Sequence, residues 1–530
     1  MAFSSPSLPL HWPVSGSLEG KKVRTRSTAV LLSACLLAVI LFTHLWRIAD
    51  LPAGLFQDES AIGLNAALIA ETGYDEHQHF LPVYFESFGD YKAPVYVYAV
   101  AAVFRIVGVS DVALRMTSAL FFTLFFASFT LLTKRLFGTN RPLTLYVFIV
   151  AGTLPWFFVL SRIAFEVISQ LAVVTAALLF VHRTFVSRHV KWHDPVLAGL
   201  LLGLSLYTYP TARLLTPLLL VTIALFFFRR STLKQSIVLS ISAAIAFVPY
   251  LAYGIAHPGA MTARFRGITY LFDASLSIVE KVELFLTNYA AYFTPTFLLF
   301  QGDPNLRHAT SYGGELFFGV LVLAVIGFVF VCRHWKHTSK FSLLIATNAV
   351  LAPVAAALTS EGTPHSLRSI LLGLWLLLLS CYGLHHLLRR ANPSLRRGIA
   401  VGVLVLVSLE SAFFLNDYFG RYAEETPGFF HSSGFRELLL ASRNAHPEAI
   451  VVSRTINYSF LAFYKHALPA SSIPIEVADP IPEAGTCLLY LPSDDQIVEA
   501  SPLLWRSLSL PGSITRARCY PGSREKVIEL

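Results

Sequence analysis

Long apolar runs alternate with short polar gaps along most of the chain. A helix that crosses a bilayer needs about 20 apolar residues, and eleven runs in the sequence approach this length. They are residues 28–46, 113–133, 142–160, 164–181, 195–209, 213–228, 236–254, 315–332, 341–358, 369–387 and 398–414. The two short runs 195–209 and 213–228 could form one broken unit. Only helices and closed barrels satisfy every backbone group in lipid, and the alternating segments of a barrel do not occur in this sequence. The pattern predicts an all-α polytopic membrane protein with about eleven transmembrane helices.

Composition and charge support this prediction and set an orientation. Of the 530 residues, 55% are hydrophobic and 14% are charged, and the mean hydropathy is +0.60; soluble domains carry about 25% charged residues. The net charge is +9, and basic clusters fall in alternate gaps, at 21–26, 134–141, 183–191, 229–234, 333–340 and 389–397. Because basic residues concentrate on the cytoplasmic side, we expect a cytoplasmic N-terminus and an extracytoplasmic C-terminus. Clusters confined to membrane loops indicate contact with membrane lipids and no nucleic-acid partner.

The first outer loop, residues 47–112, is long and acidic. Within it, residues 93–107 are apolar enough to form a helix in the membrane. A full crossing at this point would move every later basic cluster to the outer side. We therefore expect a juxtamembrane or re-entrant helix there.

The tail from residue 416 has a different pattern. Residues 434–445 and 458–466 have helical patterns, and 449–453 and 487–491 are typical of buried strands, which together predict a small extracytoplasmic α/β domain. Cys487 and Cys519 lie in this tail, where an oxidising compartment permits a disulfide; whether they pair stays open. The chain thus divides into a disordered cytoplasmic tail (1–27), a transmembrane domain (28–415) and an extracytoplasmic domain (416–530).

Ionisable side chains cost about 2.5–3.5 kcal/mol each at the centre of a span, so those that occur tend to be functional. In this chain they gather near the outer ends of the spans and in the short outer gaps. They are Arg115, Arg162, Glu166, Arg213, Glu315, Glu361, His365, Arg368 and Glu410. One interpretation is a single cavity that opens outward, and the other is that charges at the ends of spans reach the headgroups. The second is favoured for Arg213 and Glu410 taken singly, and the alignment of the whole set favours the first.

An acidic pair, Asp58-Glu59, follows the first span closely. A hydroxyl nucleophile needs a positioned base at neutral pH, and a carboxylate can serve in glycosyl transfer, where an oxocarbenium-like centre also favours nearby negative charge. In that interpretation Asp58 is the base, and Glu59 orients the acceptor or holds Asp58. The alternative is an ordinary solvated turn.

Cationic groups suited to a phosphate occur at the same membrane edge. Lys92 precedes an apolar helix that Pro94 starts, and its ammonium could bind a lipid phosphate or act as an interfacial anchor. The segments 302–308 and 361–368 each combine a turn with a histidine and an arginine. An arginine fork suits a phosphate ester, and a histidine can donate to its oxygens; the alternative is that these groups only close loops. The sequence has no phosphate-binding P-loop, which disfavours ATP-driven transport.

At these residues the chain resembles the GT-C glycosyltransferases, in particular the phospholipid-carrier-dependent protein mannosyltransferase and aminoarabinose transferase branch. The likeness lies in residues 56–59, 88–94, 114–120 and 161–166 and in the GDPNLRH and PHSLRS segments, and it covers most of 28–415. The resemblance implies a polyprenyl-phosphate sugar donor outside the cytoplasmic membrane. Asp58 matches the family's catalytic aspartate, Lys92 a lysine that contacts the carrier phosphate, and Arg115 an arginine of the following span. The family has two prolines after that lysine, and here Ala93 replaces the first.

These observations predict an inverting glycosyltransferase that moves a sugar from a polyprenyl-phosphate carrier to an acceptor at the extracytoplasmic face of the cell membrane. The acceptor offers a hydroxyl or an amine, and a glycan, a lipid and a protein all stay open. Asp58 and Glu59 are the expected catalytic residues. The expected substrate-binding residues are Lys92, Arg115, Arg162, Arg307, His308, His365 and Arg368. A monophosphate can leave once its charge is met, so no cofactor is required, although a divalent metal is left open.

Two other functions compete with this one. A transporter or flippase of lipid-linked sugars would use the same cationic cavity without chemistry, but the sequence shows no repeated halves with broken helices. A non-catalytic assembly protein of the envelope would use the tail as its binding module.

Overall fold

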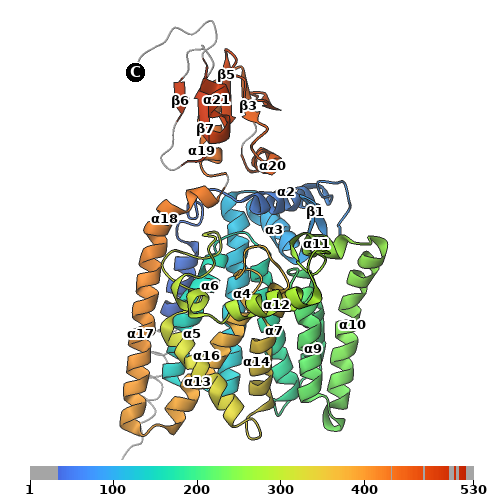
Figure 1. The fold of residues 1–530 in the computed structure, drawn as a ribbon, viewed down its shortest axis with the longest axis vertical. Coiled ribbons are helices and arrows are strands. Elements are labelled where there is room, and N and C mark those ends of the chain that lie inside the picture. Colours follow the sequence, from blue (N-terminus) through green and yellow to red (C-terminus); the bar gives the residue numbers. More distant parts are fainter. Residues whose placement is uncertain (1–33, 431, 469–471, 500–505, 509–512, 521–530) are drawn as a thin grey trace, which may run out of the picture. The chain divides into compact units, whose positions relative to one another are not determined.

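The computed structural model describes residues 34–430, 432–468, 472–499, 506–508 and 513–520. The chain forms two compact units, residues 1–43 and 44–530. The tail expected over 1–27 and the start of the first span lie outside the described residues, and the rest of that span belongs to an apolar helix, Ala34–Leu45. The unit 44–530 contains a bundle of long helices, an outer layer of short helices with a hairpin, and a small sheet (Figure 1).

The long helices confirm a mainly helical membrane protein. Six described segments are long and apolar enough to cross a membrane: α4 (Asp111–Phe137), α7 (Val167–Phe185), Arg230–Ala256 with α10 (Leu233–Ala256), Lys340–Ala357 with α14 (Lys340–Leu351) and α15 (Val354–Ala357), α16 (Ile370–Arg390), and Pro393–Glu425 with α17 (Pro393–Phe419) and α18 (Arg421–Glu425). Shorter apolar helices are α3 (Pro94–Val107), α5 (Arg141–Thr153), α9 (Ala212–Phe227) and α13 (Phe318–Arg333). The number of crossings stays a prediction.

The structure adds detail to three of the expected runs. The run 142–160 consists of α5 and α6 (Pro155–Leu160), because Pro155 has no N–H to continue the ladder of α5 and instead stands in the first turn of a new helix. The runs 195–209 and 213–228 form separate helices, α8 (His193–Leu204) and α9, with the short helix η1 (Ser205–Tyr207) between them.

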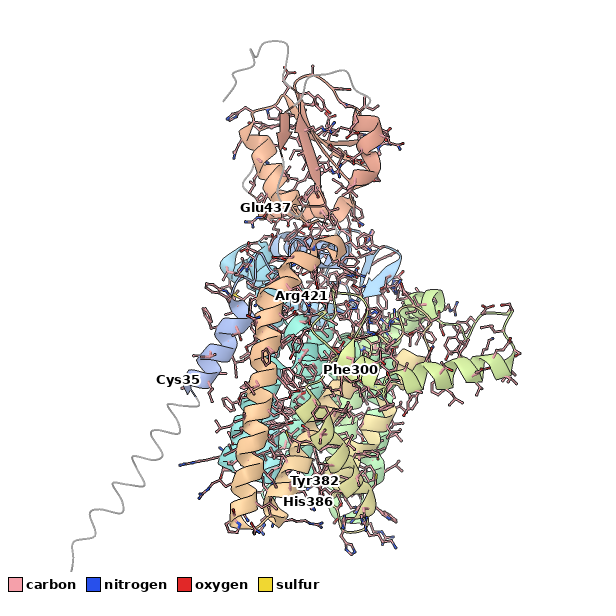
Figure 2. All side chains as sticks on the ribbon, turned by 60° about the vertical axis from the view of Figure 1, so that its left-hand side comes forward. Cys35, Phe300, Tyr382, His386, Arg421 and Glu437 are labelled. Atoms are coloured by element: carbon pink, nitrogen blue, oxygen red, sulfur yellow. A yellow bond between two sulfur atoms is a disulfide. The ribbon has the colours of Figure 1, made fainter. Side chains whose placement is uncertain are left out.

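Glycine allows α13 and α16 to approach closely. A Cβ atom at Gly327 of α13 would lie 2.1 Å from the carbonyl oxygen of Leu379, and one at Gly383 of α16 would lie 2.1 Å from that of Leu323. Neither position can carry a side chain at this separation, which is the usual reason for small residues between membrane helices. The contact fixes α16, which begins directly after the segment 361–368. His386 lies near the C-terminal end of α16. Figure 2 shows His386 and Arg421 at opposite ends of the bundle.

The first outer loop contains a helix that the sequence did not suggest. α2 (Gln57–Thr72) begins directly before Asp58 and Glu59, so the acidic pair stands in a first helical turn, where the helix dipole favours negative charge. A two-residue turn joins β1 (Phe85–Ser87) to its antiparallel partner β2 (Asp90–Lys92). The expected helix over 93–107 is α3, with Pro94 in its first turn.

The tail folds as the expected small α/β unit. The predicted helices are α19 (Phe435–Asn444) and α20 (Tyr458–Ala467), and the predicted strands are β3 (Ala449–Ser453) and β5 (Thr486–Tyr490). The sheet has the order β4-β3-β5-β7-β6, completed by β4 (Ile475–Ala478), β6 (Arg506–Leu508) and β7 (Arg516–Cys519). β3 runs parallel to β4 and β5, whereas β7 is antiparallel to β5 and β6. Cys487 and Cys519 face each other on β5 and β7 and form a disulfide.

Another outer helix, α12 (Ile278–Ala291), lies in the segment 255–314, where the sequence analysis placed none. Ser277 caps it: the Ser277 hydroxyl accepts from the N–H of Glu280, and the Glu280 carboxylate accepts from the N–H of Ser277. This reciprocal pair is a capping box, which a Ser-x-x-Glu pattern before an apolar run could have indicated.

Candidate active site

A cavity of about 800 Å³ opens among the short helices, the hairpin and the loops at one end of the bundle. Its walls come from the start of α2, the β1–β2 hairpin, α11 (Ala263–Ile268) and the loops around 209–214, 303–308 and 355–368. The cavity brings together six of the residues expected from the sequence: Asp58, Lys92, Arg307, His308, His365 and Arg368. The other three expected residues, Glu59, Arg115 and Arg162, are not among the described residues that line it.

A close charge pair in the cavity joins Asp58 to Lys92. The ammonium nitrogen of Lys92 lies 2.9 Å from Oδ1 of Asp58, with the Asp58 side chain 37% exposed and that of Lys92 7% exposed. Burial alone would raise the pKa of Asp58, but the ammonium of Lys92 and the guanidinium of Arg307 outweigh it and hold the pKa below its usual value. Asp58 is therefore an ionised carboxylate at neutral pH, ready to accept a proton.

Lys92 stands between several carboxylates. Burial would lower its pKa, but Asp58, Glu166 and Asp90 together raise it, so the ammonium form persists. The carboxylate of Glu166, which also lines the cavity, accepts a hydrogen bond from the backbone N–H of Ala93. A proline at position 93 would have no N–H to donate. The replacement of the family's first proline by Ala93 thus supplies a bond that holds the residue next to Lys92.

Arg115 and Glu59 form a fully buried pair. Nε of Arg115 lies 3.1 Å from Oε1 of Glu59, and neither side chain is exposed. The Arg115 guanidinium also donates to the carbonyl oxygens of Ile48 (3.2 Å), Pro52 (2.7 Å) and Gly54. Glu59 in turn accepts from the backbone N–H of Phe56 at 2.9 Å and of Ala164 at 2.8 Å. The pair ties the chain before Asp58 to α4 and to the segment that precedes α7.

Arg162 has a comparable set of contacts. Its guanidinium donates to the carbonyl oxygens of His44 (2.8 Å), Trp46 (2.6 Å) and Leu51 (3.2 Å), and its Nε donates to the hydroxyl of Tyr418 at 3.1 Å. The side chain is fully buried. Two arginines thus hold the segment 44–54 through its backbone. The roles in substrate binding and catalysis expected for Arg162, Arg115 and Glu59 stay predictions, and their contacts favour positioning of the loop.

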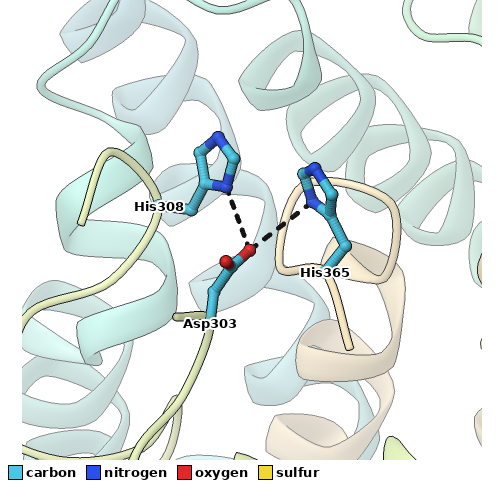
Figure 3. A group of neighbouring side chains, drawn as sticks. All are labelled: Asp303, His308 and His365. Carbon is cyan, nitrogen blue, oxygen red and sulfur yellow. Dashed lines mark hydrogen bonds and ion pairs between the residues drawn. The ribbon is translucent and has the colours of Figure 1, made fainter. Parts of the chain in front are cut away.

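The loops 302–308 and 361–368 meet in a cluster around Asp303 (Figure 3). Oδ2 of Asp303 lies 2.9 Å from Nδ1 of His308 and 3.5 Å from Nδ1 of His365, and the two rings stack with centroids 4.6 Å apart. Oδ2 also accepts the N–H of Ser366 at 2.9 Å. Burial and the neighbouring cations lower the pKa of His365 well below its usual value, so this imidazole is neutral. The three ligand atoms lie within 4.8 Å of one another, a spacing that could hold a metal ion.

A third group of charges lies at the side of α11. The exposed carboxylate of Glu361 bridges Arg368 at 3.0 Å and Arg264 at 2.9 Å. Arg368 also donates to the hydroxyl of Thr359 at 3.0 Å. Both guanidinium groups line the cavity, and Glu361 holds them there.

Arg307 extends over the ring of Phe56, with its guanidinium carbon 3.6 Å from the ring centroid. Its Nε donates to Asn305 at 3.1 Å. The planar guanidinium therefore lies beside the residue that precedes α2, close enough for its charge to act on Asp58.

Asp303 and Phe88 are two cavity residues for which the sequence pattern predicts no individual role. Asp303 lies in the GDPNLRH segment, and its spacing of five residues from His308 could have suggested a pair within one turn. Phe88 lies at the tip of the β1–β2 hairpin, and nothing in the sequence pattern distinguishes it from other exposed aromatic residues.

The chain and its structure were compared with known protein families and solved structures. The family model of dolichyl-phosphate-mannose-protein mannosyltransferases matches residues 91–253. The structure is similar to ArnT from Cupriavidus metallidurans, bound to undecaprenyl phosphate and in the apo state, with a TM-score of 0.59 and 12% identity in both comparisons. The similarity covers 92% or 93% of this chain and 98% of ArnT. No sequence among the curated proteins matches the chain.

The oligosaccharyltransferase AglB from Archaeoglobus fulgidus, in complex with an inhibitory peptide and a dolichol-phosphate, is similar over 82% of this chain and 64% of its own, with 13% identity and a TM-score of 0.49. The resemblance expected from the sequence is confirmed by the family match and by the fold shared with ArnT. The family model describes dolichyl-phosphate-mannose-protein mannosyltransferases, and the likeness to ArnT shows that the two chains share a fold.

The contacts of Arg115 predict a loss of stability when it is replaced. Arg115→Met leaves the Glu59 carboxylate buried without its cation and several carbonyl oxygens without a donor. Removing one partner of a buried pair costs about 3–5 kcal/mol, so we expect the variant to unfold at a clearly lower temperature than the parent protein. The measurement is thermal unfolding of the purified proteins in detergent.

Arg307→Met is the matched control, because Arg307 lies in the cavity and pairs with no buried carboxylate in the described part of the chain. It should unfold at the parent temperature. An Arg115→Met protein as stable as the control would contradict the positioning role.

Proposed function

We propose that the protein is an inverting glycosyltransferase that moves a sugar from a polyprenyl-phosphate carrier to an acceptor hydroxyl or amine. The observation that carries the proposal is the ion pair of Asp58 and Lys92 at the edge of a cavity rich in arginine and histidine. The fold shared with ArnT, whose structure holds undecaprenyl phosphate, supports a lipid-phosphate donor. The acceptor is a glycan, a lipid or a protein.

Asp58 acts as the base. Its ionised carboxylate takes the proton from the acceptor hydroxyl as the acceptor oxygen forms a bond to C1 of the sugar. The bond between C1 and the phosphate oxygen breaks on the opposite face, which inverts the anomeric centre and releases polyprenyl phosphate. Lys92 occupies Oδ1 of Asp58 in the described structure, and binding of the donor phosphate draws the ammonium toward the phosphate and leaves Asp58 open to the acceptor.

Cations stabilise the leaving group. Lys92, Arg307 and Arg368 line one cavity, where low dielectric strengthens their attraction for the phosphate dianion that forms. His308 and His365, held in place by Asp303, present their other ring nitrogens for hydrogen bonds to donor oxygens. Glu59, Arg115 and Arg162 serve this chemistry by fixing the segment that carries Asp58.

A metal ion has no required part in this scheme, because the cations already meet the charge of a monophosphate. The cluster of Asp303, His308 and His365 offers one carboxylate and two imidazole ligands, a set that suits Zn²⁺. We propose this cluster as the place where a divalent metal binds in a metal-containing form of the enzyme.

The proposed site faces the outer side of the cell membrane. The cavity loops precede α16, and the basic residues Arg389 and Arg390 lie in its last turn, which fits a cytoplasmic end opposite the cavity. In this arrangement the chain crosses eleven times, residues 1–27 are cytoplasmic, 28–415 form the catalytic domain, and 416–530 lie outside. A flippase of lipid-linked sugars would need the same cations but no base, and the ion-paired Asp58 favours the transferase.

One prediction of the proposed function concerns Asp58 as the base. Asp58→Asn cannot accept a proton, so transfer should fall about 10²- to 10⁴-fold. Binding of undecaprenyl phosphate should persist, because Lys92 and the arginines remain. The measurements are release of polyprenyl phosphate from synthetic polyprenyl-phosphate sugars and binding of the carrier to protein in nanodiscs.

Asp90→Asn is the control, because Asp90 also lines the cavity and bonds only its neighbouring backbone N–H among the hydrogen bonds described for its side chain. It should transfer sugar at close to the parent rate. Equal transfer by the Asp58 and Asp90 variants would exclude Asp58 as the base.

Another prediction of the proposed function concerns the pH dependence of sugar transfer. Transfer needs ionised Asp58, and the lowered pKa of Asp58 places the acid limb of the kcat/KM profile below the ordinary aspartate range. Lys92→Met removes the main cation while the burial that raises the pKa remains. The acid limb of the residual activity should therefore move to higher pH, and an unshifted limb would contradict the assignment.

A further inference from the structure

The turn of the β1–β2 hairpin has an unusual residue. Ser87 pairs with Asp90, so Phe88 and Gly89 form a two-residue turn, and both have positive φ, 56° and 71°. Turns of this kind favour Asn-Gly, because a bulky side chain is strained at positive φ. Such strain costs about 1–3 kcal/mol and often marks a functional position.

Burial of the ring does not explain why phenylalanine stands there. The Phe88 side chain is 40% exposed and lines the cavity that holds Asp58 and Lys92. Its ring centroid lies 5.9 Å from the ammonium nitrogen of Lys92. The strained turn thus presents an open aromatic surface near Lys92, the partner of the proposed base.

A second exposed aromatic ring stands beside Phe88 and comes from the tail. Tyr458, the first residue of α20, is 49% exposed, and its ring centroid lies 5.8 Å from that of Phe88 at an angle of 65°. The Tyr458 hydroxyl donates to Glu76 at 2.8 Å, which fixes the ring. We call Phe88 and Tyr458 the aromatic pair.

Polar contacts hold the start of α20, and with it Tyr458, at the start of α2. The hydroxyls of Ser459 and Ser60 lie 2.6 Å apart, and Asn457 donates to the side chain of Gln57 at 3.4 Å. Gln57 lines the cavity and directly precedes Asp58. The α20 end of the tail is therefore fastened to the helical turn that carries the base.

We propose that the aromatic pair binds a sugar ring of a carbohydrate acceptor and places its hydroxyl at Asp58. A pyranose presents a face of C–H groups to the negative face of an aromatic ring, while its hydroxyls reach polar neighbours. Glu76, which accepts from the Tyr458 hydroxyl, and Asn457, which precedes Tyr458 and bonds Gln57, supply such neighbours. An apolar lipid tail would not need these polar neighbours. The two exposed rings, fixed in position, suit a rigid sugar. The proposal rests on the proposed function and names its acceptor as a glycan or glycolipid headgroup.

The test uses full-length protein in nanodiscs free of sugar detergent, with methyl α-D-mannopyranoside, methyl β-D-glucopyranoside and methyl α-D-arabinofuranoside as probes. Saturation-transfer NMR should show binding of at least one probe to the parent protein. Phe88→Asn should weaken that binding about fivefold to tenfold, as loss of an aromatic contact implies. Because asparagine tolerates positive φ, the same variant should be at least as stable as the parent. Phe88→Trp keeps an aromatic ring at this position and should bind the same glycoside as the parent protein does.

Phe80→Asn is the matched control. Phe80 is 64% exposed in the same outer loop and pairs with Tyr74, but it is not among the described residues that line the cavity. It should leave glycoside binding unchanged. Absence of glycoside binding to the parent, or equal binding by Phe88→Asn, overturns the aromatic pair as a sugar site. Undecaprenyl phosphate binding by Phe88→Asn should stay at the parent level, and loss of carrier binding in Lys92→Met reports separately on the proposed function.

Discussion

The guanidinium of Arg115 has no access to water and must find all its partners inside the protein. It finds them in Glu59 and in the backbone carbonyl oxygens of the segment before α2. Because Glu59 is bound by Arg115 and by two backbone N–H groups, the first turn of α2 is fixed in rotation, and the neighbouring Asp58 lines the cavity. In the proposed function Asp58 is a base that must reach the acceptor hydroxyl, and a rigid support keeps it at the required distance.

The cavity shows a balance of charge that the proposed chemistry can use. Three of its carboxylates lie beside basic groups: Asp58 beside Lys92, Asp303 beside two histidines, and Glu361 beside two arginines. An arriving phosphate competes with these carboxylates for the cations, so donor binding rearranges pairs that already exist. The site thereby avoids unpaired buried cations before the donor arrives, which would be costly.

Much of this architecture could be predicted from the sequence, and the limits have physical reasons. The positions of the helices could be predicted because a membrane helix needs a long apolar run. Asp58, Lys92 and the loop residues could be grouped because they occur at one end of the predicted spans. The same criterion could not separate lining residues from supporting ones. Arg115 and Glu59 are 56 residues apart, and their pairing depends on how α2 packs against α4. Phe88 and Tyr458 lie in different parts of the chain, so only the folded structure brings their rings together.

The central claim is that one pocket holds the carrier phosphate beside the base. The most direct measurement is a cryo-electron microscopy structure of the protein in nanodiscs with undecaprenyl phosphate. The account predicts phosphate density within hydrogen-bond distance of Nζ of Lys92, between Asp58 and the guanidinium groups of Arg307 and Arg368. Phosphate density outside this cavity, with Lys92 still bonded to Asp58, would contradict it.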